Sequence, residues 1–278
     1  MRVRYVNHKG KEIDFMQSPY LFQSGNLLDF TWQYELNRGV KSRIQGLQKS
    51  DVPIPLSVAI VSDTMQEFEK FAYELNEVTE TDVLAEIPGK LYVNDYYLKC
   101  YVLQDMPTDW NKGIPYIKRN LQVMPDYPFW CHEFSQQFYK GFAAQRSDPF
   151  LHYPIRYPYQ YSAPKDLRLF HNDHYADCDF KMIIYGPCID PMIRINGHPY
   201  SFKLTLYEGE FLEVESRYNT VERVQKDGTR LTEFNQREKK DSVFQKIPAG
   251  NCSVVWNTSE FGFDLILYQE RSEPKWTL

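Results

Sequence analysis

The densest group of potential metal ligands contains two histidines, His171 and His174, in a His-x-x-His spacing. Asp177, Cys178 and Asp179 follow shortly afterwards. Imidazole, thiolate and carboxylate groups are typical zinc ligands, but structural zinc sites usually take four ligands in tighter Cys and His clusters. No second cluster in the sequence completes this set. A polar loop before a strand is the favoured interpretation, and we assign no metal ligands.

Four glutamates could supply the paired carboxylates that hydrolysis of a glycosidic bond requires. They are Glu208, Glu210, Glu213 and Glu215. In an extended strand Glu213 and Glu215 point to the same face, where a solvated sheet surface accounts for them without catalysis. An enzyme acting on cell-wall polysaccharide is therefore the weakest of the hypotheses.

Trp256 is a candidate for sugar binding, because Asn251 and Asn257 lie close to it in the sequence. An indole ring can stack on a sugar while amide groups hydrogen-bond its hydroxyls. A glycan-binding accessory module is therefore an alternative function, from a different class than an assembly protein.

No motif of nucleophilic or phosphate chemistry is present. The sequence lacks a G-x-S-x-G elbow, a Walker loop and an H-E-x-x-H motif. Cys131 and His132 are neighbours in sequence, which does not make a catalytic pair, and a packed cysteine beside a surface histidine is the simpler interpretation. We assign no catalytic or cofactor-binding residues, and we expect no enzyme and no cofactor.

Composition narrows the class of protein further. The chain has 278 residues, enough for two domains that each bury a core, and its 32 basic residues are scattered against a formal net charge of −5. Nucleic acid is therefore not an expected partner. The five cysteines form no C-x-x-C pair, and no apolar run approaches the ~18 residues that span a bilayer. We expect a soluble protein made in the cytoplasm, without membrane insertion.

One helix is expected in the first half of the chain. Thr64 and Glu67 fit a capping box, and apolar side chains follow at helical spacing at Met65, Phe68, Ala72 and Leu75. The apolar stripe should pack on a sheet formed by residues 90–93 and 97–103, which flank a turn at 94–95. Tyr97 and Tyr101 alternate with apolar residues in that sheet, so a tyrosine-bearing face is a candidate subunit interface.

The second half predicts an antiparallel β-sandwich. Apolar residues alternate on both sides of Asn196-Gly197, a pair that tolerates the positive backbone angles of a type I′ turn. Further short strands with turn residues between them follow to residue 268. We predict a mainly β chain, with a β-rich domain containing one α-helix at 1–158 and a β-sandwich at 159–278. The boundary lies in a segment rich in prolines and aromatic residues, at 125–164.

Motifs in the C-terminal half resemble the distal tail proteins of long-tailed phages, the family called Dit or siphovirus-type tail component. Their order and spacing agree with that family from residue 184 to residue 276. The N-terminal half resembles the family more loosely, through the helix from Thr64 and residues 89–97. The C-terminal motifs lie at 184–187, 193–197, 208–216, 242–251, 261–264 and 268–276.

The resemblance implies a virion structural protein rather than an enzyme. It implies that N-terminal domains close into a hexameric ring, which joins the tail tube to the tail tip and the host-adhesion apparatus, while a galectin-like sandwich faces outward. The implied partners are other copies of the chain, the tail tube protein, the tail-tip hub protein and receptor-binding or baseplate proteins. The sugar-binding constellation of galectins does not map onto this sequence, so the fold analogy does not carry sugar binding with it.

Overall fold

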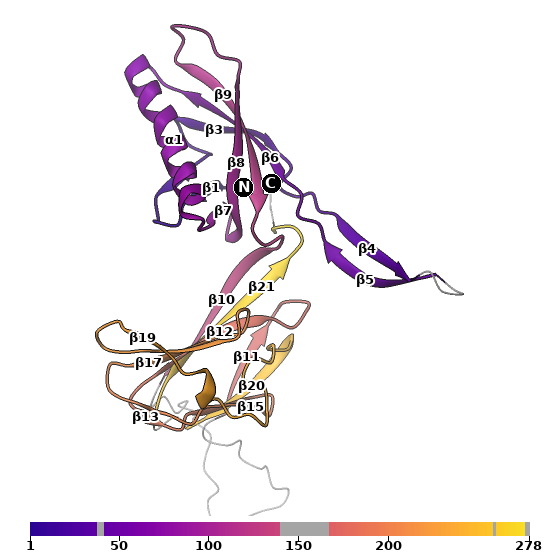
Figure 1. Cartoon of the computed structure of the whole chain (residues 1–278), viewed down its shortest axis with the longest axis vertical. Coiled ribbons are helices and arrows are strands. Elements are labelled where there is room, and N and C mark those ends of the chain that lie inside the picture. The colour runs from indigo at the N-terminus through magenta and orange to yellow at the C-terminus, as the bar shows by residue number, and fades with distance from the viewer. Residues whose placement is uncertain (38–41, 140–166, 258–259, 276–278) are drawn as a thin grey trace, which may run out of the picture. The chain divides into compact units, whose positions relative to one another are not determined.

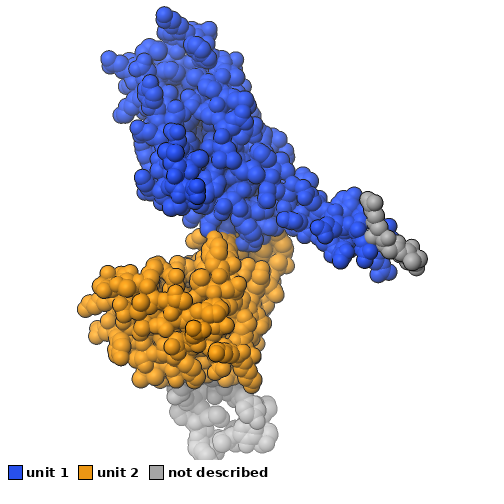
Figure 2. Space-filling model, viewed as in Figure 1, with its two compact units in different colours: residues 1–132, 270–278 blue, residues 133–269 orange. Residues whose placement is uncertain are grey.

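The computed structural model describes residues 1–37, 42–139, 167–257 and 260–275 (Figure 1). The chain divides into two compact units, unit 1 with residues 1–132 and 270–278, and unit 2 with residues 133–269 (Figure 2). Strands dominate both units, which confirms the predicted mainly β class. The domain boundary predicted at residue 158 lies outside the described residues and stays a prediction; the chain leaves unit 1 within β10 (Trp130–Phe138) and returns within β21 (Phe263–Arg271).

Unit 1 is built on one antiparallel sheet with the strand order β2-β1-β7-β8-β9-β6-β3. Helix α1 contacts β8, β6 and β2 of this sheet. Strands β4 and β5 form a separate hairpin. The elements are β1 (Val3–Val6), β2 (Glu12–Asp14), β3 (Tyr20–Gly25), β4 (Trp32–Asn37), β5 (Arg43–Lys49), β6 (Ile54–Val61), α1 (Met65–Ala85), β7 (Gly89–Val93), β8 (Tyr96–Thr108) and β9 (Tyr116–Pro125).

Helix α1 begins where the capping pattern predicts. Thr64 is the N-cap, and its hydroxyl oxygen accepts a 3.3 Å hydrogen bond from the backbone N–H of Glu67. The helix ends at Glu86, which adopts the left-handed conformation with φ 55°. Leu75 and Val78 are fully buried against the sheet, so the helix completes the core of unit 1.

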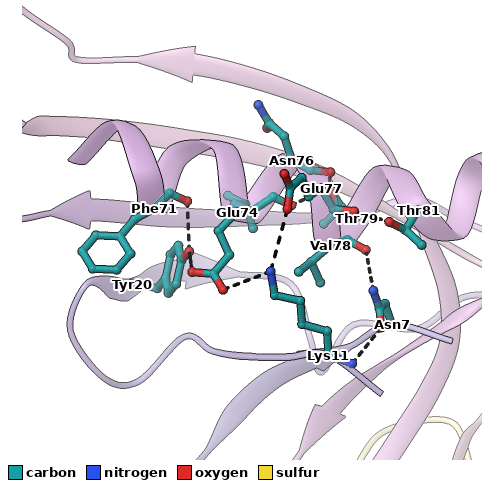
Figure 3. Close-up of polar contacts among 11 residues, drawn as sticks. Asn7, Lys11, Tyr20, Phe71, Glu74, Asn76, Glu77, Val78, Thr79 and Thr81 are labelled. Carbon is teal, nitrogen blue, oxygen red and sulfur yellow. Dashed lines mark hydrogen bonds and ion pairs between the residues drawn. The ribbon is translucent and has the colours of Figure 1, made fainter. Parts of the chain in front are cut away.

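Polar contacts fix the helix to the N-terminal strands. The hydroxyl of Tyr20 donates to the Phe71 carbonyl oxygen at 2.9 Å, and Lys11 Nζ lies 3.2 Å from Glu74 Oε1 (Figure 3). Asn7 donates from Nδ2 to a helix carbonyl oxygen at 3.4 Å. These contacts set the position of the helix over the sheet, in addition to apolar packing.

Unit 2 is a pair of antiparallel sheets around a second core. One sheet has the order β19-β18-β17-β12-β21, the other β11-β20-β14-β15. Buried side chains from both sheets form a single cluster, which includes Phe180, Ile184, Ile193 and Val254. The remaining elements of the unit are β11 (Leu167–Asn172), β12 (Asp179–Tyr185), β13 (Cys188–Ile189), β14 (Met192–Ile195), β15 (His198–Ser201), β16 (Thr205–Leu206), β17 (Phe211–Glu215), β18 (Thr220–Val224), β19 (Arg230–Thr232), the 3-10 turn Phe234–Gln236 and β20 (Gly250–Trp256).

The turn predicted at Asn196-Gly197 is confirmed. Both residues have positive φ angles, 48° and 85°, and Ile195 lies opposite His198 across the hairpin. Those angles fit a type I′ turn, which matches the right-handed twist of the two strands. The alternation around the turn buries Ile193, Ile195 and Tyr200 in the core of unit 2.

Candidate assembly surface

The hairpin of β4 and β5 has no neighbouring strand within the described chain. The two strands pair only with each other, and they extend away from the remainder of unit 1 (Figures 1 and 2). At its root the hairpin is closed by the backbone N–H of Ser50, which donates to the Thr31 carbonyl oxygen at 2.9 Å. A two-stranded hairpin is at best marginally stable in water, so a projecting one is expected to find a partner.

The pairing register gives the hairpin one apolar face and one polar face. Residues directly opposite each other point to the same side. The apolar face carries the pairs Trp32 with Lys49, Tyr34 with Leu47 and Leu36 with Ile44; the polar face carries Gln33 with Gln48, Glu35 with Gly46 and Asn37 with Arg43.

The apolar face is uncovered in the lone chain. The exposed fractions are 61% for Tyr34, 64% for Leu47, 58% for Ile44, 47% for Leu36 and 43% for Trp32. Burying a large apolar side chain fully is worth roughly 1.5–3 kcal/mol. Five such side chains in one row are therefore typical of an interaction site rather than of ordinary surface.

A pocket of about 200 Å³ lies at the root of the hairpin. Lys49, the last residue of β5, lines it and is only 8% exposed. Its ammonium group donates a 2.8 Å hydrogen bond to the Ser272 carbonyl oxygen and lies 4.9 Å from the ring centre of Phe129. Burial lowers the pKa of Lys49 to about 8. The pocket is lined by Asn26, Asp29, Phe30, Thr31, Lys49, Ser50, Val52, Pro53, Ile54, Pro55, Leu98, Pro125, Pro128, Trp130 and Ser272.

The tyrosine face proposed from the sequence is not an open surface. Tyr97 is only 5% exposed, because its ring packs 5.8 Å from Tyr92 and the ammonium of Lys90 lies 4.3 Å above it. Tyr101 is half-buried. The prediction of a subunit interface there is therefore wrong for Tyr97. The alternation of Trp32, Tyr34 and Leu36 with polar residues is the sequence signal that would have indicated the hairpin face.

The residues considered as metal ligands do not converge. The ring nitrogen Nδ1 of His171 lies 2.8 Å from Asn251 Oδ1, whereas His174 is buried with its Nδ1 3.0 Å from the Ala176 carbonyl oxygen. Cys178 is buried in the core of unit 2. Within the ranges that the structure describes, no group of three or more His, Cys, Asp or Glu side chains is placed to hold a metal ion.

The two glutamates of β17, Glu213 and Glu215, form polar contacts with other strands of their own sheet. Glu213 forms an ion pair with Lys181 at 2.7 Å, and Glu215 accepts a 2.6 Å hydrogen bond from the hydroxyl of Tyr268. Burial is the largest influence on Glu215 and raises the pKa of its carboxyl group. Glu210 accepts a hydrogen bond from the backbone N–H of Tyr207 at 3.0 Å. Glu208 is exposed.

Trp256 is part of the core and not of a sugar-binding surface. It is 3% exposed, and its indole Nε1–H donates to the Phe261 carbonyl oxygen at 3.0 Å. Its ring meets Phe263 edge-on at 5.4 Å. The hypothesis that Trp256 stacks on a sugar is therefore wrong, since the ring is enclosed by protein. Cys131 is also buried, and His132 packs against Tyr96 at 5.3 Å.

No helix of the described residues is both long enough and apolar enough to traverse a bilayer. No protein-family model matches the sequence, and no curated protein matches it at a significant level.

Solved structures match the fold over nearly the whole chain. The SPP1 Dit (gp 19.1) protein, described as a paradigm of the hub adsorption apparatus in phages that infect Gram-positive bacteria, superposes with a TM-score of 0.61 at 8% identity, covering 97% of this chain and 98% of that chain. A chain of the phage P2 baseplate in its activated conformation with calcium superposes with a TM-score of 0.62 at 11% identity, covering 98% and 99%. The strontium form of that baseplate gives the same TM-score and identity, covering 99% and 100%. This chain therefore has the fold of phage distal tail and baseplate hub proteins.

Proposed function

We propose that this chain is a structural component of a phage tail tip: a distal tail protein that acts through assembly. The observation that carries the proposal is the match to Dit and baseplate chains over both compact units, with almost no unmatched residues on either side. The C-terminal sequence motifs point to the same family independently of the structure comparison.

Unit 1 is the proposed assembly module, with copies arranged in a hexameric ring. A ring needs a heterologous interface, in which one patch meets a different patch on the next copy. The uncovered apolar face of the β4–β5 hairpin supplies one such patch. Obligate interfaces of this type bury upwards of ~2,000 Å², so the hairpin face is expected to form only part of the contact between copies.

The proposed partners are neighbouring copies, the tail tube protein, the tail-tip hub protein and other baseplate proteins, with the virion tail tip as the location. We propose no catalytic activity. The carboxylates of β17 are engaged within their sheet, and Trp256, the residue considered for glycan binding, is enclosed in the core of unit 2.

Native mass is the measurement that tests the proposal. Light scattering coupled to gel filtration, over a concentration series of the full chain, is expected to detect a discrete ring that negative-stain imaging resolves as a closed particle. A protein that stays monomeric at high concentration and is absent from virions, as judged by antibody labelling, would contradict it.

A further inference from the structure

Lys49 places a buried cation at the root of the hairpin without a counter-ion. Its ammonium group has three N–H donors, and one donates to the Ser272 carbonyl oxygen. Among the described residues no carboxylate forms an ion pair with it. Asp29 also lines the pocket, yet it forms no ion pair with Lys49. Besides the ring of Phe129, 4.9 Å away, no further partner of the ammonium group is found among the described residues, so donors remain for a group that enters the pocket.

A buried charge without a partner costs several kcal/mol, and a carboxylate that supplies charge and hydrogen bonds together offsets part of that cost. The lowered pKa of Lys49 reflects the cost, since burial is its single cause. Leucine or methionine at this position would make the folded lone chain more stable than the buried lysine does. A lysine in this environment is thus best explained by a partner that the lone chain does not supply.

The pocket beside Lys49 has the chemistry to hold a short acidic side chain. Phe30, Val52 and Leu98 provide apolar walls for methylene groups. Asn26 and Ser50 provide amide and hydroxyl groups that can donate hydrogen bonds to carboxylate oxygens. A volume of about 200 Å³ admits one side chain and excludes a folded element.

We propose that this pocket receives a glutamate or aspartate side chain of a second copy of this chain, which forms an ion pair with Lys49 on assembly. The inference rests on the proposed function and names the polar anchor of the hairpin interface. Lys49 lies opposite Trp32 on the apolar face. A second copy that covers that face therefore also lies beside the pocket. The chain has 37 acidic residues against 32 basic ones, which makes a second copy a suitable source of the carboxylate.

Association of the full-length variants tests the ion pair. K49M should weaken self-association by roughly 30-fold, because truncating one partner of a buried charge pair leaves the other charge unpaired. K49R, which keeps the charge, should weaken it less. K112M, at an exposed lysine of unit 1, is the matched control and should leave association unchanged. Equal association of wild type and K49M overturns the inference while leaving the assembly proposal intact.

The pKa of Lys49, followed by nuclear magnetic resonance of isotope-labelled lysine side chains, gives a second readout. It should rise from about 8 in the dilute chain to above 10 in the assembly. Propionate added to the dilute chain should raise it as well, whether or not the chain assembles. An unchanged pKa in both experiments, or a value already above 10 in the dilute chain, overturns the inference. A response to propionate in a chain that never self-associates overturns the second copy as the occupant, whereas the proposed function is then decided by the presence or absence of the protein in virions.

Discussion

Tyr34 and Leu47 lie directly opposite each other in the β4–β5 hairpin, and each side chain is more than three-fifths exposed. They form the central pair of the apolar face, between Leu36 with Ile44 towards the tip and Trp32 with Lys49 at the root. A central position in a row that becomes buried is where the largest binding contributions are usually found.

The double variant Y34S/L47S is expected to lower self-association strongly without unfolding unit 1. Both side chains are exposed in the lone chain, so their loss removes little packing there, whereas an interface would lose about 2 kcal/mol or more. Light scattering over a concentration series measures the association, and circular dichroism on heating measures the folded state.

The opposite face of the same hairpin supplies the control. Gln33 and Gln48 are also directly paired, and Q33S/Q48S changes the polar face at a neighbouring position of the ladder. Association should then stay within about threefold of wild type. Equal losses in both double variants would indicate that the hairpin as a whole, and not its apolar face, determines assembly.

A buried carboxylate holds the C-terminal end of helix α1 to the first strand. Asp82, fully buried, accepts a 2.6 Å hydrogen bond from the hydroxyl of Tyr5 and a 2.8 Å bond from the backbone N–H of His8. Burial raises the pKa of Tyr5, so its hydroxyl stays protonated and donates. Gly89 of β7 leaves room for the pair: a Cβ atom there would lie 2.2 Å from Asp82 Oδ2 and 2.4 Å from the Tyr5 oxygen.

G89A and D82N should therefore each lower the free energy of unfolding of the full chain by about 2 kcal/mol, the first through overpacking and the second through unmatched buried donors. Urea titration measures the loss. D95N, in the exposed turn between β7 and β8, should change it by less than about 0.5 kcal/mol. A G89A variant as stable as wild type would mean that β7 can move away from the helix.

Local signals were sufficient for several elements. The Asn196-Gly197 pair predicts its turn because few residues adopt positive φ at both positions, and Thr64 predicts the helix start because its hydroxyl satisfies an amide within the same turn. Both signals depend only on residues close in sequence. The burial of a side chain by residues of another strand leaves no such local pattern in the sequence.

The burial of Tyr97 and of Trp256 depends on which side chains the fold places over each ring. Tyr97 is covered by side chains of the neighbouring strand, and Trp256 by Phe138 and Phe263. The alternation of Trp32, Tyr34 and Leu36 with polar residues indicates an extended strand with one apolar face, and such a face is usually buried by the rest of the fold. Only the absence of a neighbouring strand among the described residues makes them a surface.

Trp256 is expected to be a stability residue. W256F removes the hydrogen bond from Nε1 to the Phe261 carbonyl oxygen and leaves unfilled volume beside Phe263. A loss of about 2 kcal/mol in the free energy of unfolding should result, with no specific loss of glycan binding. Thermal unfolding measures the loss of stability, and a glycan array probed with the folded variant measures any loss of glycan binding. Glycan binding by wild type that disappears in a stably folded W256F would restore the sugar-binding hypothesis.

Lys49 should make the stability of the lone chain depend on pH in a direction that distinguishes it from a surface lysine. Burial lowers its pKa from 10.5 to about 8, so the folded chain releases a proton that the unfolded chain still holds between these values. The buried ammonium group therefore lowers the free energy of unfolding below pH 8. This loss becomes smaller from pH 8 to 10.5 and is absent above that range.

K49M removes this dependence. At pH 7 and at concentrations below association, the variant should be more stable than wild type by about 1–3 kcal/mol, and the advantage should fall towards zero by pH 10.5. Urea titrations at pH 7, 8.5 and 10.5 measure the difference in the free energy of unfolding between K49M and wild type. Groups that titrate alike in both proteins do not contribute to this difference. K112M should give a difference that does not vary with pH. A stability difference for K49M that is equally flat would show that the ammonium of Lys49 is already compensated in the lone chain, and the pocket would then have no need of a carboxylate from outside.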